Sequence, residues 1–130
     1  MNNEKSVSAA SMYKKDSLIN NKTLTFALRI IEMAKYIREK DNENVLTKQV
    51  LRSGTSIGAS VRESEFAQSQ QDFIHKLSIS LKEANETDYW LCLLNKAGFI
   101  NDASYVSMKN DCDEITAILI ASIKTAKSHT

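Results

Sequence analysis

The chain has 130 residues, of which 42% are apolar and 25% are charged, and its formal net charge is +1. This length suits one domain with its own hydrophobic core. The chain has no proline and only three glycines, which argues against a turn-rich β-sandwich and favours long helices. A net charge this small provides no general attraction for nucleic acids or membranes.

The ends of the chain and its two cysteines point to a soluble cytoplasmic protein. Lys14 and Lys15 are not followed by an apolar segment of the kind found in signal peptides. The apolar run at 115–123 is too short to span a bilayer. Cys92 and Cys112 lie in apolar helical segments, which favours buried thiols in a reducing compartment over the alternative of a structural disulfide.

Residues 1–20 are mostly Asn, Ser and Lys, and we expect a mobile N-terminal tail before a four-helix bundle at 21–127. The first helix is predicted over 21–40. Apolar residues at helical spacing form its inner face, namely Phe26, Ile30, Met33 and Ile37. A second set widens this apolar arc: Leu24, Ala27, Ile31 and Ala34. In the polar break that follows, Asn42 or Asn44 is expected to cap the next helix.

The second helix is predicted over 45–68, with an inner face of Leu46, Val50, Ile57 and Val61. Gly54 and Gly58 lie in its middle, within a run of small residues at 53–60. Each glycine costs about 1 kcal/mol of helix stability relative to alanine. Close approach of a neighbouring helix would offset this cost, and a break in the helix with a functional loop is the alternative.

Ser69 and Asp72 resemble a capping box at the start of a third helix that ends near Lys96. Its inner face is predicted to contain Phe73, Leu77, Leu81, Ala84 and Leu91. Gly98 is expected in a left-handed conformation after this helix, and Asn101 or Asp102 caps a fourth helix that ends near residue 127. That helix has an inner stripe of Met108, Cys112, Ile115 and Leu119. The short connections predict an all-α, antiparallel up-down-up-down bundle.

The last two helices carry more apolar residues than one stripe requires. The additional residues are Ile79, Trp90, Leu93 and Leu94 on the third helix, and Ile118 and Ile120 on the fourth. Large apolar patches are rare on monomers, so these residues are candidates for an oligomer interface. A wide core is the alternative interpretation.

One basic stripe runs along the second helix. Its members follow i, i+4, i+7, i+11 and i+14: Lys48, Arg52, Thr55, Ala59 and Arg62. One interpretation is a track for nucleic-acid phosphates, with Lys48, Arg52 and Arg62 as contact residues. The other is internal pairing, in which Arg52 or Arg62 meets Glu83 and Glu86. In the first interpretation, further cations add to the contact surface: Lys14, Lys15, Lys22, Lys35, Arg38 and Lys40.

The sequence predicts no cofactor, no metal site and no catalytic residue. A di-iron bundle needs two Glu-x-x-His pairs, whereas Asp72 with His75 is the only loose analogue and His129 lies at the C-terminus. Cys92 and Cys112 lack metal-ligand spacing. We therefore do not expect an enzyme.

Four segments carry a family resemblance: LRSGTSIGAS at 51–60, DFI at 72–74, LKEANET at 81–87 and YWL at 89–91. Over about residues 21–127 the chain resembles the bacterial four-helix-bundle family encoded in intervening sequences of 23S ribosomal RNA genes. Ser60–Val61 stands where that family usually has Asn-Ile. The resemblance implies a ring-like homo-oligomer, a homopentamer, and similarity to the accessory protein of diversity-generating retroelements. That relative is a basic pentameric barrel that works with a reverse transcriptase and binds nucleic acid. The resemblance implies no enzymatic activity.

Two hypotheses about function follow. The first is a ring-forming accessory protein that binds RNA or DNA, for which the resemblance and the basic stripe are the reasons. The second is an oligomeric scaffold or protein–protein adaptor without nucleic-acid binding, which the near-neutral charge and the surplus apolar residues favour. Neither hypothesis involves a membrane.

Overall fold

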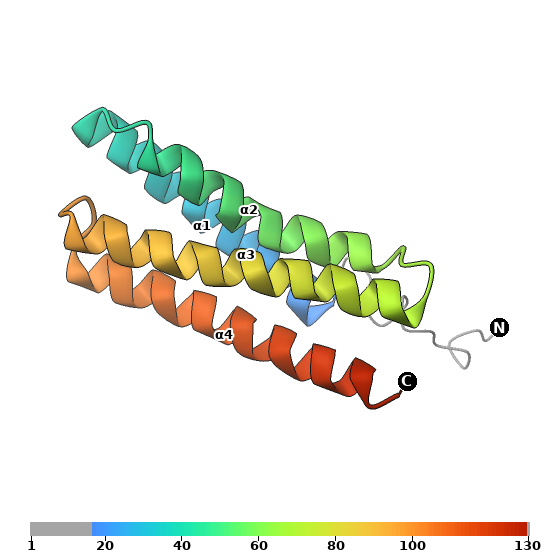
Figure 1. Cartoon of the computed structure of the whole chain (residues 1–130). Helices are drawn as coiled ribbons and strands as arrows, with labels where there is room; N and C mark the ends of the chain where they lie inside the picture. Colours follow the sequence, from blue (N-terminus) through green and yellow to red (C-terminus); the bar gives the residue numbers. More distant parts are fainter. Residues whose placement is uncertain (1–16, 130) are drawn as a thin grey trace.

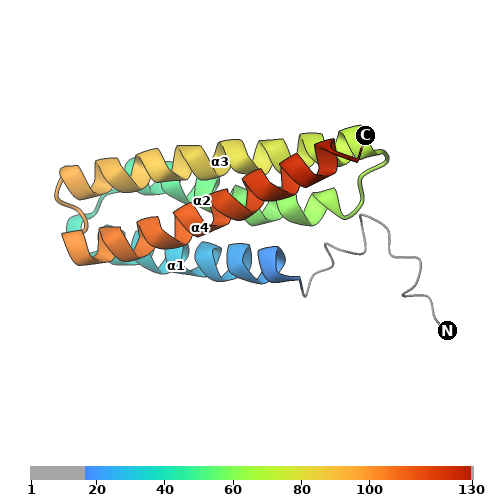
Figure 2. The ribbon, with the colours of Figure 1, turned by 90° about the horizontal axis from the view of Figure 1, so that it is seen from below.

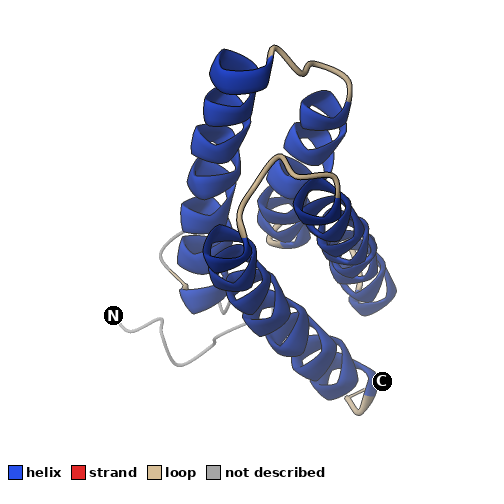
Figure 3. Cartoon of the chain, turned by 90° about the vertical axis from the view of Figure 1, so that its left-hand side faces the viewer, coloured by secondary structure: helices blue, strands red, loops and turns tan. Residues whose placement is uncertain are grey.

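The computed structural model describes residues 17–129, and this part of the chain contains four helices and no strand. The helices are α1 (Leu18–Asp41), α2 (Leu46–Ser64), α3 (Gln70–Lys96) and α4 (Asp102–Lys127). Successive helices run in opposite directions in an elongated bundle, with turns at its two ends (Figure 1). Figure 3 views the end that carries the α1–α2 and α3–α4 turns. The all-α class and the four predicted helices are confirmed, and the assembly into a ring stays a prediction.

The first helix begins earlier than the sequence pattern predicted. Ser17 caps α1, because its Oγ accepts a hydrogen bond from the Asn20 amide at 3.3 Å, and Ile19 is already buried in the core. Of the tail predicted over 1–20, residues 17–20 therefore belong to α1 and its cap. The remainder of that prediction, at 1–16, lies outside the described residues.

The cap of α2 differs from the prediction. Asn42 ends α1 in the left-handed conformation (φ 55°), and its amide donates to the Arg38 carbonyl. The Glu43 carboxylate, rather than Asn42 or Asn44, caps α2. It accepts hydrogen bonds at 2.8–3.0 Å from the backbone amides of Val45, Leu46 and Thr47. The prediction was wrong because the longer Glu side chain reaches back over three amides that the helix leaves unpaired.

This cap predicts a pH-dependent contribution to stability. Burial raises the pKa of Glu43, but the three backbone amides outweigh burial and hold its pKa below the ordinary value. The stabilisation is therefore present above the pKa of an unfolded Glu and is lost as the pH falls through the folded pKa. We expect Glu43→Ala to lower the free energy of unfolding at pH 7 by about 1 kcal/mol, as other cap deletions do.

The measurement is urea unfolding of both proteins at pH 7 and near pH 3, where we expect the two to converge. Glu39→Ala is the matched control, because Glu39 is exposed near the end of α1 and makes no ion pair among residues 17–129. A difference for Glu43→Ala that stays constant across this range would show that the charge of the cap is irrelevant.

The turn between α2 and α3 contains more residues than predicted, and it begins with a tighter winding of the chain. α2 ends at Ser64, and the amides of residues 65–67 donate to carbonyls three residues earlier, which winds the chain out of the α-helix. Ser69 then caps α3 by accepting from the Asp72 amide at 3.0 Å, and Asp72 accepts from the Gln68 amide at 3.1 Å. The predicted cap is confirmed.

The α3–α4 turn follows the prediction closely. Gly98 has a φ of 87°, which L side chains rarely adopt, and it allows the chain to leave α3. Asn101 caps α4 by accepting from the Ser104 amide at 2.8 Å. The amides of Phe99 and Ile100 donate back to a carbonyl in the last turn of α3. The backbone amides of this turn therefore find their hydrogen-bond partners locally.

The small residues of α2 let α1 approach closely. A Cβ atom on Gly54 would lie 2.9 Å from Cγ1 of Ile30, and one on Gly58 would lie 3.0 Å from Oγ1 of Thr23. α2 is continuous from Leu46 to Ser64. Close packing of the two helices is therefore confirmed, and the alternative of a break with a functional loop is wrong.

Buried polar groups join α3 to α2. The Ser80 hydroxyl donates to the Ile57 carbonyl at 2.8 Å, and the hydroxyls of Ser53 and Thr87 are hydrogen-bonded at 2.9 Å. The predicted inner faces are otherwise confirmed as core, with Leu46 and Leu81 only half-buried against it. The core thus runs the length of the bundle.

The contact between α1 and α4, here called the seam, differs from the contacts between successive helices. These helices contact each other more sparsely than successive helices do, and they diverge toward the C-terminus of α4 (Figure 2). Ion pairs bridge the seam, with Lys22 2.8 Å from Glu114 and Arg29 2.5 Å from Asp111. Arg29 also donates to the Ser107 hydroxyl at 2.9 Å. Ion pairs therefore bridge α1 and α4 in addition to the apolar core that the two helices share.

Candidate nucleic-acid interface

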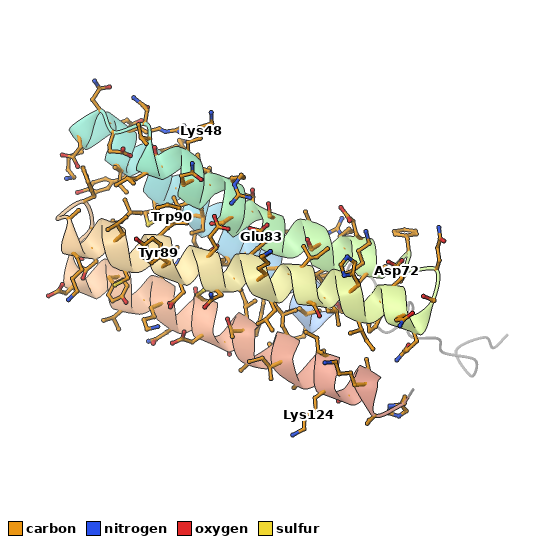
Figure 4. The ribbon with its side chains drawn as sticks, in the orientation of Figure 1. Lys48, Asp72, Glu83, Tyr89, Trp90 and Lys124 are labelled. Atoms are coloured by element: carbon orange, nitrogen blue, oxygen red, sulfur yellow. The ribbon has the colours of Figure 1, made fainter. Side chains whose placement is uncertain are left out.

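The predicted basic stripe forms the outer ridge of α2. Lys48, Arg52 and Arg62 are all exposed, because residues spaced by three or four positions along a helix share one face. Lys48 projects away from the bundle near the α1–α2 turn (Figure 4). At 1.5 Å per residue, Lys48 and Arg62 lie about 21 Å apart along the helix axis. The ridge is therefore continuous and open to a large ligand.

The middle cation of the ridge is paired internally. Arg52 Nη2 lies 2.5 Å from Glu86 Oε2, and its Nη1 lies 3.6 Å from Glu83 Oε1. Glu86 also accepts from the Trp90 indole at 3.1 Å, and Glu83 and Trp90 project from α3 toward α2 (Figure 4). The predicted pairing is confirmed for Arg52. Its side chain is nevertheless 52% exposed, so the pair is accessible to solvent.

The pKa values of this pair reflect the contact. The hydrogen bond to Glu86 raises the pKa of Arg52, and the bonds from Trp90 and then Arg52 lower the pKa of Glu86. Glu83 contributes charge but no hydrogen bond, since its Oε1 atom is buried without a hydrogen-bond partner. Two carboxylates therefore face one guanidinium, which neutralises Arg52 at the centre of the ridge.

The two ends of the ridge are not paired. Within residues 17–129, neither Lys48 nor Arg62 makes an ion pair with a carboxylate. Of the two arginines predicted as alternatives for Glu83 and Glu86, Arg62 does not take this role, because it lines a hollow on the α1 side of α2 together with Leu24. The ends of the ridge therefore keep a positive charge that is available to an anion.

Other cations divide into two groups. The helix-one candidates are occupied: Lys22, Lys35 and Lys40 have carboxylate partners, and Arg38 donates to the Thr47 hydroxyl at 2.9 Å. Lys14 and Lys15 lie outside the described residues. Lys82 and Lys96 on α3 are exposed without an ion pair in the described part of the chain. The sequence did not predict these two lysines, because single lysines on a helix give no signal until its exposed face is known.

The predicted oligomer interface is only partly available. Leu94 is 1% exposed and belongs to the core, so its assignment to an interface was wrong. Leu91 and Leu94 are three residues apart and therefore share the inner face of α3. The other candidates keep some exposure: Ile79, Trp90, Leu93 and Ile118 are half-buried, and Ile120 is exposed.

The exposed apolar surface is concentrated on α1 instead. Leu24, Leu28 and Ile31 follow i, i+4 and i+7 spacing and are 36–55% exposed. They widen the apolar arc of α1 beyond the face that α2 and α4 cover. The apolar spacing predicted that Leu24 and Ile31 belong to this arc, but only the packing shows that the arc faces solvent.

The described residues contain little that suggests other chemistry. Among residues 17–129, no three metal-ligating side chains gather into a site, and no helix is long and apolar enough to cross a membrane. His75 is exposed. Burial raises the pKa of the Cys112 thiol to about 12, and Cys92 is half-buried. The two thiols are not joined in a disulfide.

Comparison with known proteins places this bundle in a family. A solved structure of a protein of unknown function from the S23 ribosomal protein family of Bacteroides thetaiotaomicron is similar to this chain, with 51% sequence identity and a TM-score of 0.81. The match covers 82% of this chain and 99% of that chain. No match was found among curated proteins. The family model described as 23S rRNA-intervening sequence protein matches residues 15–121. The chain therefore belongs to the 23S rRNA-intervening sequence protein family.

Proposed function

We propose that this protein is a non-enzymatic, self-associating helical bundle that binds the phosphate backbone of RNA or DNA along the outer ridge of α2. The supporting observation is that Lys48 and Arg62 are exposed at the two ends of this ridge without carboxylate partners in the described residues. Phosphate contacts are additive and independent of sequence. A ring-like homo-oligomer repeats the ridge in every subunit, so a few cations per chain suffice.

The test is fluorescence anisotropy of labelled single-stranded RNA and duplex DNA, titrated with the full chain at several salt concentrations. We expect affinity that weakens linearly with the logarithm of salt concentration. Lys48→Glu together with Arg62→Glu should weaken binding about tenfold or more and flatten the slope by roughly 2 for duplex DNA.

The matched control is Lys124→Glu compared with Lys48→Glu alone. Both lysines are exposed, and they project from opposite sides of the bundle (Figure 4). Lys124→Glu changes the net charge equally and should leave affinity nearly unchanged. Equal losses in the two variants would mean that only net charge matters and that α2 is not the binding site.

A second variant tests the role of the internal pair. Glu86→Gln removes the closer carboxylate of Arg52 and should make this guanidinium available to phosphate. Exposed ion pairs are weak, so affinity should rise by at most about fivefold. Glu114→Gln on α4 is the control for the loss of one negative charge. A fall in affinity for Glu86→Gln would show that the pair positions Arg52 rather than occupying it.

An oligomeric scaffold or adaptor that binds no nucleic acid is the second candidate function. The exposed Leu24, Leu28 and Ile31 on α1 favour it, because contiguous apolar surface usually marks a protein contact. We propose a homopentamer, which native mass spectrometry should show as five times the 14.6 kDa chain mass. An oligomer that fails to bind RNA and DNA at low salt would favour the scaffold. A strictly monomeric protein would count against both functions.

A further inference from the structure

The outer face of α3 carries one tyrosine between two lysines. Lys82, Tyr89 and Lys96 are spaced by seven residues each, so they share one face of the helix and lie about 10 Å apart along its axis. Both lysines are exposed, and neither makes an ion pair among residues 17–129. Tyr89 is 60% exposed. A cation, an aromatic ring and a second cation therefore follow one another along this face.

In the run YWL at 89–91, Tyr89 alone takes no part in the core. Leu91 is fully buried, and Trp90 packs against the core while its indole donates to Glu86 at 3.1 Å. The rings of Tyr89 and Trp90 contact each other, with centroids 5.2 Å apart and planes inclined at 66°. Rings inclined in this way do not stack face to face. The exposed Tyr89 ring is therefore held in place and remains open to a parallel partner.

The two acidic residues that precede Tyr89 most closely already have cationic partners. Glu86 Oε2 lies 2.5 Å from Arg52 Nη2, and Asp88 Oδ1 lies 3.0 Å from Lys109 Nζ. The two lysines of the outer face have no such partner in the described part of the chain. They are therefore the cations on this face that are available to a phosphate.

This face of α3 lies beside the basic ridge of α2. The two helices are antiparallel, and the pair formed by Arg52 and Glu86 fixes their register. One turn from this pair, Lys48 on α2 comes level with Trp90 on α3, next to Tyr89 (Figure 4). Packed helices lie about 8–10 Å apart. A strand whose phosphates follow the ridge can therefore place a base on the Tyr89 ring.

We propose that Tyr89 is a stacking platform for a base of single-stranded nucleic acid, with Lys82 and Lys96 as contacts to the phosphates on either side. This role rests on the proposed function of the α2 ridge and adds a preference for one form of nucleic acid. An unpaired base offers its flat face to an aromatic side chain. The bases of a duplex are stacked on one another and offer only their edges in the grooves. Single strands therefore gain a contact that duplexes lack.

The first experiment is fluorescence anisotropy of the full chain and of Tyr89→Ala, with a labelled single-stranded RNA and a duplex RNA that has the same number of phosphates. Tyr89→Ala should weaken binding of the single strand by about fivefold to a hundredfold, the range expected for the loss of one stacked base. Binding of the duplex should change by less than about twofold, because its phosphate contacts are retained.

Matched variants separate stacking from other effects of the substitution. Tyr89→Phe keeps the ring and should bind the single strand as the parent does, whereas Tyr89→Leu keeps only apolar surface and should lose affinity as alanine does. Tyr36→Ala is the control for removal of an exposed tyrosine. Tyr36 is 55% exposed on α1, and Lys40 lies 5.5 Å from its ring centroid. Its removal should leave the affinity for single strands unchanged.

Two further measurements report on the lysines and on the position of the base. Lys82→Gln together with Lys96→Gln should flatten the salt dependence of single-strand binding by roughly 1.4, because two phosphate contacts are lost. Trp90 is the only tryptophan of the chain. A base stacked on the neighbouring Tyr89 should quench its fluorescence, and the duplex should not.

The outcomes separate this role from the function proposed for the α2 ridge. Single-strand binding that is unchanged in Tyr89→Ala would overturn the stacking role and leave the function of the ridge standing. Failure to bind either RNA at low salt would overturn both. A loss of affinity in Tyr89→Ala that accompanies a smaller assembly in native mass spectrometry would place Tyr89 in a contact between subunits, which also overturns the stacking role.

Discussion

Gly54→Val is expected to lower the free energy of unfolding by about 2–3 kcal/mol, as overpacking of a close helix contact does. The new Cβ atom would lie 2.9 Å from Cγ1 of Ile30 and 3.3 Å from its Cβ. Ile30 is fully buried and β-branched, so it has neither space nor a second good rotamer to move into. The two helices must therefore separate locally or α1 must shift.

Valine is a sharper probe than alanine at this position. Alanine gains about 1 kcal/mol of helix propensity over glycine, which would hide part of the steric cost. Valine has a helix propensity closer to that of glycine, so the measured change reports mainly packing. Chemical denaturation followed by circular dichroism gives the free energy of unfolding.

Gly58→Ala is the matched control, one turn farther along the same helix. Its Cβ atom would lie 3.0 Å from the Thr23 hydroxyl oxygen, and Gly58 is half-buried. Here the gain in helix propensity and the tight contact oppose each other, and we expect a change within about 1 kcal/mol. An unchanged stability for Gly54→Val would show that α1 and α2 are not in close contact at Ile30.

Thr87→Val is expected to lower the free energy of unfolding by about 1–3 kcal/mol, because it leaves the buried Ser53 hydroxyl without its cross-helix partner. Both side chains are fully buried between α2 and α3. Valine has nearly the shape of threonine, so little of this loss comes from packing. The Thr87 hydroxyl also donates to the Glu83 carbonyl, a local bond within α3 that stabilises the tertiary fold little.

The double variant Ser53→Ala with Thr87→Val separates the two causes. It removes both polar partners, so no hydroxyl stays buried and unpaired, and stability should recover most of the loss. Ser56→Ala is the control for serine replacement on α2, since within residues 17–129 its hydroxyl bonds only to the Arg52 carbonyl of its own helix. Additive losses in the double variant would mean that Ser53 and Thr87 are not energetically coupled.

Much of the fold was predictable because its signals are local. The inner faces of all four helices follow from apolar spacing at a period of 3.6 residues, which fixes the buried side of a helix wherever it packs. Ser69, Gly98 and Asn101 likewise act through their own backbone neighbours. The Glu43 cap was missed because Asn is the commoner cap, and the Glu bonds to residues on the far side of the turn.

The candidate site was predictable as a ridge but not as a charge distribution. Helical periodicity alone placed Lys48, Arg52 and Arg62 on one face of α2. Which of these charges is neutralised depends on the carboxylates of the neighbouring helix. The spacing of residues within α2 carries no information about where that helix lies. Arg52 pairs with Glu86 on α3, whereas Arg62 lies on the side of α2 that faces α1 and has no carboxylate partner among the described residues.

The sequence by itself determined the number of helices, their inner faces and most of their ends. Each of these depends on groups within one or two turns of each other, so local physics suffices. The tertiary structure decided that Leu94 is core, that α1 exposes Leu24, Leu28 and Ile31, and that ion pairs bridge α1 and α4. Those properties depend on how far each helix is covered by its neighbours, and this emerges only when all four pack together.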